Sequence, residues 1–280
     1  MERIERDTVA EMFRIHGGHD IFTQSLARVS SREHLIQLLD LHINVLNAPF
    51  VGFSAILGGR IVLSRDAFVN PKQQATMAVA DRATVVAERV IFAIIDEVGE
   101  RSIRSHPSHR ALAQATFLGI MAWLKIAPVM LNAFYESEVR KSAARMVEKI
   151  GAIYGVDQDR TEESLWGGLG AHLAGEYSAI TEFAILDTWL RKQHIAPGMV
   201  EYLEKTVTNI EDRACPAYAW LPLHHHEEAE HTDAAFVAIE NALTYWAGSC
   251  SRECALRYLW DGIEDFAATY AAFAKILLEL

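Results

Sequence analysis

The sequence is poor in the residues that interrupt helices and in those that cross-link small secreted domains. Only 7 prolines occur in 280 residues, and the long segments between them repeat apolar side chains at helical spacing, without the alternation of β-strands. The three cysteines, Cys215, Cys250 and Cys254, are too few and odd in number for a disulfide framework. We therefore expect an all-α protein in a reducing compartment, the cytoplasm.

Long apolar runs and excess positive charge are also absent. Charged residues interrupt the apolar runs before they reach the ~20 residues of a membrane span, and the start, MERIERDTVAEMF, lacks the apolar segment of a signal peptide. The net charge of −11 argues against nucleic acid, because nucleic-acid sites gather basic residues. We expect a single domain over residues 1–280 that binds a small-molecule substrate and neither nucleic acid nor membrane, as a monomer or a homodimer.

Start and stop signals divide the chain into helices. Ser30-x-x-Glu33 resembles a capping box, Gly58-Gly59 predicts a break, and Asn70-Pro71 predicts a new helix start. The segments expected to be helical are about 3–15, 30–53, 70–97, 108–123, 129–152, 161–193, 198–209, the segment that follows Cys215-Pro216 up to about 246, and 251–278.

The stretch Leu221–Asp233, LPLHHHEEAEHTD, holds four of the 12 histidines and four acids. At about 100° per residue, a helix places His224, Glu228 and His231 on one side. That face continues into small or apolar residues, namely Ala235, Ala238, Ile239, Ala242 and Trp246. Buried histidine and carboxylate side chains need partners, and a metal ion suits all three.

A second face of the same helix offers a different set of possible ligands. It carries His226, Glu230 and Asp233, and it continues into Val237, Glu240, Asn241 and Thr244, which predicts contact with solvent. The remaining alternative is a solvated helix start whose first-turn acids are Glu227 and Glu228. The inward face is the better prediction for a metal site.

Further carboxylates lie on other predicted helices. The stripe Val79, Ala83, Val86, Val90 and Ile94 leads to Glu97, which either reaches water from a fraying last turn or lies in the core as a ligand. On the long helix 161–193, Glu176 and Glu182 lie on different sides, and periodicity does not choose between them. His16, His34, His172 and His194 are expected to be surface or satisfied core residues.

These motifs resemble those of the haem-oxygenase-like di-iron oxidases and oxygenases, also called CADD-like proteins. The run from Tyr218 to His224, followed by Glu228 and His231, is similar to the His-x3-Asp/Glu-x2-His of the family's third core helix. Asp96-Glu97 with Pro107-Ser108-His109, and Leu173-Ala174-Gly175-Glu176, are similar to its first and second core helices. The spacing from Glu97 to His109 is longer than is usual in the family, which leaves His106 as an alternative to His109; Glu182 and Glu136 are alternatives to Glu176.

The resemblance implies a haem-oxygenase/TenA-like bundle of seven or more helices with two iron ions and O₂ as co-substrate. The implied metal ligands are Glu97, His109, Glu176, His224, Glu228 and His231. The implied reaction is N-oxygenation, desaturation or oxidative C–C cleavage of a small organic substrate in specialised metabolism. The alternatives on the same fold are a metal-independent TenA-like hydrolase, with Cys215 as its candidate nucleophile; a haem-binding relative with His19 or His42 as axial ligand; and a non-catalytic iron-binding bundle.

Overall fold

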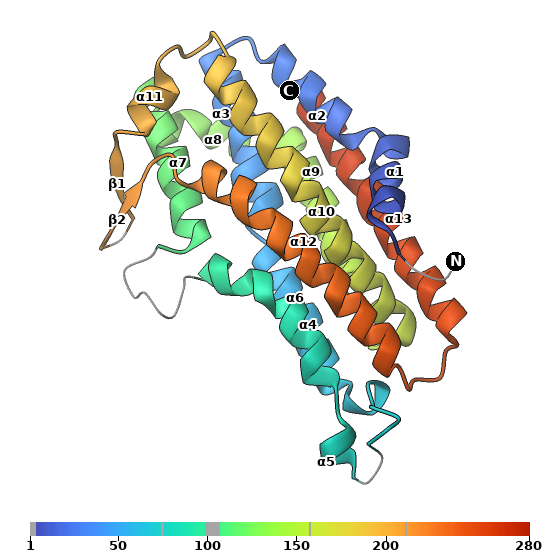
Figure 1. The fold of residues 1–280 in the computed structure, drawn as a ribbon. Coiled ribbons are helices and arrows are strands. Elements are labelled where there is room, and N and C mark those ends of the chain that lie inside the picture. The colour runs from blue at the N-terminus through green and yellow to red at the C-terminus, as the bar shows by residue number, and fades with distance from the viewer. Residues whose placement is uncertain (1–3, 74–75, 99–106, 157, 211) are drawn as a thin grey trace.

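The computed structural model describes residues 4–73, 76–98, 107–156, 158–210 and 212–280, and in this part of the chain nearly every element is a helix (Figure 1). The prediction of an all-α bundle is confirmed. The α-helices are α1 Arg6–His16, α2 Gly18–Arg28, α3 Arg32–Asp40, α4 Phe50–Leu63, α5 Met77–Ala80, α6 Ala83–Val98, α7 His109–Leu124, α8 Asn132–Tyr135, α9 Glu138–Ile153, α10 Glu162–Lys192, α11 Met199–Leu203, α12 Trp220–Tyr245 and α13 Arg252–Leu278.

Three long helices, α10, α12 and α13, form the frame of the bundle, with α10 packed against both of the others. The α10 and α13 backbones approach very closely where both helices carry glycine. A Cβ atom at Gly170 would lie 2.1 Å from the carbonyl oxygen of Leu259, and one at Gly262 would lie 2.1 Å from the carbonyl oxygen of Gly167. Glycine is therefore required at these two positions for the helices to pack as they do.

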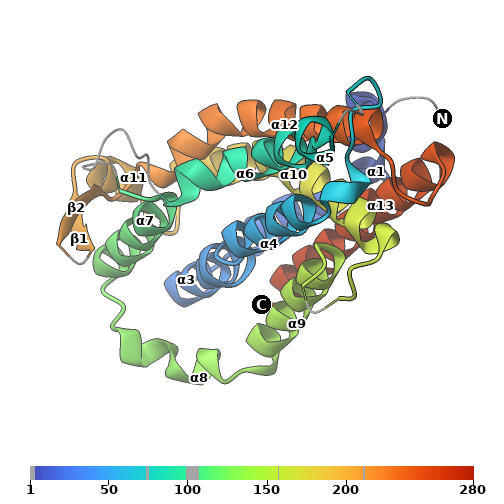
Figure 2. The same ribbon diagram turned by 90° about the horizontal axis from the view of Figure 1, so that it is seen from below.

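Helices α3 and α4 lie inside this frame, and α6 packs against both α4 and α12. Figure 2 shows α3 and α4 running through the middle of the bundle, with α6, α10 and α12 on one side and α9 and α13 on the other. Between α3 and α4 the helix widens into a π-helical segment, Leu41–Asn47. Wide turns of this kind are rare and often occur at functional sites.

The segment Arg32–Leu63 is long and apolar enough to cross a membrane by length and composition alone. It is interrupted by the π-helical turns and by the bend at Ala48–Pro49. Leu35, Ile36, Leu57 and Ile61 belong to the continuous cluster of buried apolar side chains that extends from α1 to α13. The apolar composition is therefore what a central helix of a bundle requires.

Several predicted boundaries are wrong, each for a local reason. Gly58-Gly59 does not break a helix but lies inside α4, where Gly58 packs tightly against the Ile91 side chain of α6. Asn70-Pro71 begins a turn, because the Asn70 side chain accepts a hydrogen bond from the Lys72 N–H. Helix α6 starts only after Asp81, whose carboxylate accepts a hydrogen bond from the Ala83 N–H.

Two further differences concern ends of helices. Ser31 rather than Ser30 caps α3, accepting a hydrogen bond from the His34 N–H. The helix expected over 198–209 is only α11, and a β-hairpin follows it, with β1 Val207–Ile210 antiparallel to β2 Arg213–Pro216. The Ala217 N–H donates to the carbonyl oxygen of Thr206, so the hairpin returns the chain to the end of α11 shortly before α12 begins at Trp220.

Candidate metal centre

Helix α12 turns the predicted face inward. His224, Glu228 and His231 are buried, with exposed fractions of 4%, 4% and 3%, whereas Glu230 and Asp233 are exposed. The side chain of His226 lies outside the described residues. The helix begins at Trp220, so Glu227 and Glu228 are not first-turn acids, and the alternative of a solvated helix start is wrong.

One cluster of possible ligands joins α6, α7 and α12. Oε1 of Glu97 lies 3.3 Å from Nδ1 of His109 and 3.3 Å from Nε2 of His224. Glu97 is in the last turn of α6, but its side chain is only 28% exposed, because the buried residues Val86 and Val90 hold this face of α6 against the core. The Ser108 hydroxyl caps α7 and makes His109 its first residue.

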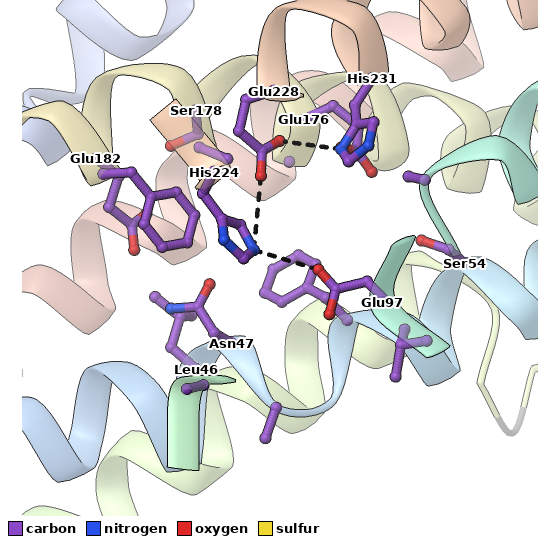
Figure 3. Close-up of a pocket in the computed structure, with 18 of the residues that line it drawn as sticks. Leu46, Asn47, Ser54, Glu97, Glu176, Ser178, Glu182, His224, Glu228 and His231 are labelled. Carbon is purple, nitrogen blue, oxygen red and sulfur yellow. Dashed lines mark hydrogen bonds and ion pairs between the residues drawn. The ribbon is translucent and has the colours of Figure 1, made fainter. Parts of the chain in front are cut away.

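A second cluster joins α10 and α12. Nδ1 of His231 lies 3.6 Å from Oε2 of Glu176 and 3.5 Å from Oε2 of Glu228. The other carboxylate oxygen of Glu228 lies 3.9 Å from Nε2 of His224, so Glu228 stands between the two clusters (Figure 3). Within each cluster of three the possible ligand atoms lie within 4.8 Å of one another.

The structure thus brings together all six residues of the predicted ligand set. Each cluster combines carboxylate and imidazole groups, and the two clusters share one helix. Their role as ligands stays a prediction, but the arrangement suits a pair of metal ions bridged by carboxylates, a design found in the cores of helical bundles.

The hydrogen bonding of His224 favours metal binding. Its Nδ1 lies 2.8 Å from the carbonyl oxygen of Trp220, which can only accept, so Nδ1 donates the proton. In neutral His224 the lone pair is therefore on Nε2, the nitrogen that faces Glu97 and Glu228. Fixing the tautomer through a backbone carbonyl is characteristic of histidine ligands.

The buried carboxylates of the two clusters are compensated by positive charge to different extents. Burial raises the pKa of Glu97, but hydrogen bonds with His109 and His224 outweigh burial and hold the pKa below its ordinary range. Burial lowers the pKa of His224. The carboxylates of Glu97 and Glu228 raise this pKa by more than burial lowers it, so it lies above its ordinary value. Both shifts favour the charged forms, so that an ionised Glu97 carboxylate is favoured beside a positively charged His224 imidazole.

In the second cluster, His231 offsets the two carboxylates only in part. Burial and the neighbouring Glu228 carboxylate raise the pKa of Glu176 to about 8, so the folded protein holds a proton there at neutral pH. The Oε2 atom of Glu228 is buried and makes no hydrogen bond with the residues that the structure describes. Buried carboxylates arranged in this way are costly unless a cation joins them, and a metal ion fits that requirement.

Two residues close to the clusters were not predicted from the sequence. Oε2 of Glu227 lies 3.1 Å from Nε2 of His109, so a carboxylate faces each nitrogen of that ring. His172 is buried in the core, one helical turn before Glu176, and its Nδ1 lies 3.4 Å from Oε1 of Glu176. Burial and the nearby His231 lower the pKa of His172 to about 3, so it is neutral.

His172 is consequently not a surface residue, and it is only partly satisfied in the core, because its buried Nε2 finds no hydrogen-bond partner in the described part of the chain. The signal that could have indicated its position was its spacing of four residues from Glu176. Glu227 offered no comparable signal, because its contact with His109 depends on how α7 packs against α12.

Glu182 and Glu136, two of the alternative ligands, lie outside the two clusters. Glu182 is buried, but Nε2 of buried His42 lies 2.5 Å from its Oε1, and this contact lowers the pKa of Glu182 although burial raises it. In Figure 3 Glu182 lies on the far side of His224 from Glu97. Glu136 is exposed at the end of α8. His106 lies outside the described residues.

The residues required by the other functions are placed less favourably. Cys215 is buried in β2 and does not belong to the described lining of the cavity next to the clusters. His42 is occupied by Glu182, and Nε2 of His19 lies 3.0 Å from the Ser178 hydroxyl.

A cavity of about 80 Å³ adjoins both clusters. Its walls come from α4, α6, α7, α10, α12, α13 and the π-helical segment. Among the described residues, those that line it include Ile43, Leu46, Phe50, Ala93, Ile94, Glu97, Glu176, Phe183, His224, Glu228 and His231. The walls are mainly apolar, and the possible metal ligands form one side, as in a site for a small organic molecule.

Comparison with known proteins gives no further identification. No family model, curated protein or solved structure matches this chain. The arguments about function therefore depend on the geometry of the site and on the motif resemblance.

Proposed function

We propose that this protein is an O₂-activating non-haem di-iron oxidase or oxygenase that acts on a small organic substrate. The observation that carries the proposal is the pair of adjoining clusters, Glu97–His109–His224 and Glu176–Glu228–His231, at the wall of an apolar cavity. N-oxygenation, desaturation and oxidative C–C cleavage are the reactions that the motif resemblance implies.

The donor set favours iron over zinc. Structural zinc sites are typically closed by four ligands and are often rich in cysteine, whereas three carboxylates and three imidazoles suit a pair of redox-active ions. Two iron ions held there would supply the electrons for O₂ reduction. The carboxylates of Glu97, Glu176 and Glu228 would balance their charge.

The chain's own groups prepare the site for such a reaction. Trp220 fixes the tautomer of His224, and Glu227 faces the second nitrogen of His109. The apolar side chains of Phe50, Ile94 and Phe183 line the space where a substrate would lie. They restrict water and leave room for a small organic group beside the ligands.

The test is anaerobic loading with Fe(II) followed by exposure to O₂. We expect about two iron ions per chain and a transient visible absorption band that forms only after O₂ is added. Less than about one iron per chain, with no O₂-dependent band, would contradict the proposal. Iron binding whose O₂ consumption goes no further than oxidation of the metal would instead indicate a non-catalytic iron-binding bundle.

A pair of variants on α12 serves as the matched control. His224→Ala should lose iron and the absorption band, because it removes a nitrogen that faces Glu97 and Glu228. Glu230→Ala should keep both, because Glu230 is exposed on the opposite face. The reverse result would mean that the ligand face was chosen wrongly.

A further inference from the structure

One cationic side chain reaches the cavity. Among the described residues that line it, Arg110 is the only lysine or arginine. Arg110 follows His109 in the first turn of α7, and the carboxylates of Asp40 and, more weakly, Glu97 attract its charge. Arg110 lines the same cavity as the possible metal ligands.

The hydrogen-bond partners of Arg110 are neutral. Its Nη1 donates to the carbonyl oxygen of Ile43 at 3.2 Å, and its Nη2 donates to Oδ1 of Asn44 at 3.0 Å. Both acceptors belong to the π-helical segment. Within the described chain, no carboxylate lies at ion-pair distance from this guanidinium, although it is half-buried.

The buried carboxylate of Asp40 is hydrogen-bonded to other side chains. It accepts a hydrogen bond from Nε of Arg140 at 2.9 Å and another from Nδ2 of Asn44 at 3.0 Å. Asn44 thus connects the two arginines, and its amide orientation is set by Asp40. The result is a positioned guanidinium that forms no ion pair with the carboxylates of the described residues.

A guanidinium in this state binds carboxylates well. It presents several N–H groups in a plane and can form two parallel, charge-assisted hydrogen bonds with a carboxylate. Arginine stays charged in proteins, and because Arg110 is half-buried, its reduced contact with water strengthens its attraction for an anion. The neighbouring lining, which includes Ile43, Leu46 and Ala113, is apolar.

We propose that Arg110 binds the carboxylate of the substrate, so that the substrate is a small carboxylic acid whose apolar body extends along the cavity toward Glu97 and His224. That this carboxylic acid is a substrate rests on the proposed function. The recognition of a carboxylate by Arg110 requires no bound metal.

The experiment measures binding of hexanoate to metal-free protein by calorimetry, with hexanamide and hexylamine as neutral and cationic analogues. Wild-type protein should bind hexanoate and neither analogue. Arg110→Gln should weaken hexanoate binding by about 10- to 100-fold, the range expected for a charge-assisted hydrogen bond. Arg110→Lys, which keeps the charge but not the paired geometry, should lie in between.

Arg145→Gln is the matched control, because Arg145 is exposed on α9 and is not among the described cavity residues. It should bind hexanoate as the wild type does. Mn(II) affinity is measured in parallel and should be unchanged in Arg110→Gln, which shows that the variant is folded.

Three results would overturn the proposal. The first is that the wild type does not bind hexanoate. The second is that wild type and Arg110→Gln bind hexanoate equally. The third is that Arg110→Gln loses Mn(II) affinity as much as it loses hexanoate affinity, which would assign Arg110 to the charge balance of the ligand clusters. The iron and O₂ assay is separate, so failure of the di-iron proposal leaves this result interpretable.

Discussion

Replacing Glu176 by glutamine should stabilise the metal-free protein. Burial and the adjacent carboxylate of Glu228 raise the pKa of Glu176 to about 8, so the folded metal-free protein holds this group protonated at neutral pH while the unfolded chain ionises it. The folded state is disfavoured by that difference. Glutamine has a similar shape and never ionises, so the penalty is removed.

The size and the pH dependence of this effect follow from the raised pKa. The penalty is absent below the ordinary pKa of 4.5, grows as pH rises, and is complete above about 8. At ~1.4 kcal/mol for each pH unit, the gain in free energy of unfolding should be at most about 1 kcal/mol at pH 5 and on the order of 3 kcal/mol at pH 7.

Urea denaturation in the presence of a chelator, at several pH values between 5 and 8, measures this directly. Glu230→Gln is the control, because Glu230 is exposed on α12, and it should change stability little at any pH. A Glu176→Gln protein that is less stable than the wild type throughout this range would refute the reasoning. The clusters would then be a structural network of ion pairs.

The same clusters and the helix crossings give further predictions. Glu227→Gln should weaken Mn(II) binding by about 10- to 100-fold, because Glu227 orients His109, and His231→Ala should abolish Mn(II) binding. Equilibrium dialysis measures both affinities, with Glu230→Gln as the control. Unchanged affinities would argue against these roles. Gly170→Ala should lower the free energy of unfolding by about 2 kcal/mol or more, because its Cβ meets a carbonyl of α13, whereas Gly167→Ala, with its nearest contact at 3.8 Å, should raise it by about 1 kcal/mol. Thermal denaturation distinguishes the two, and equal effects would contradict the close crossing.

The sequence predicted the long helices well and the first third of the chain poorly. The expected helices over 161–193 and 251–278 match α10 and α13 within about two residues, because Thr161 and Ser251 cap them. The π-helical turns and the late start of α6 leave no periodic signal. They result from side-chain hydrogen bonds and packing that a one-dimensional pattern does not contain.

In the candidate site, too, some residues could be predicted from the sequence and others could not. His224, Glu228 and His231 could be found because all three lie on one helix, where periodicity relates them directly. The choice between Glu176 and Glu182 could not be made, since both are on inward sides of α10. The neighbours favour Glu176, because Glu176 meets His231 while Glu182 meets His42.

The glycine crossing of α10 and α13 bears on how this protein can diversify. Helices separated by side chains shift when those side chains change, whereas α10 rests on α13 through main-chain atoms at Gly170 and Gly262. Glu176 follows Gly170 by less than two turns on the same helix, so its position is set by the main-chain contact between α10 and α13. The cavity walls can therefore change in sequence, and with them the molecule that fits, while the position of Glu176 relative to α13 is kept.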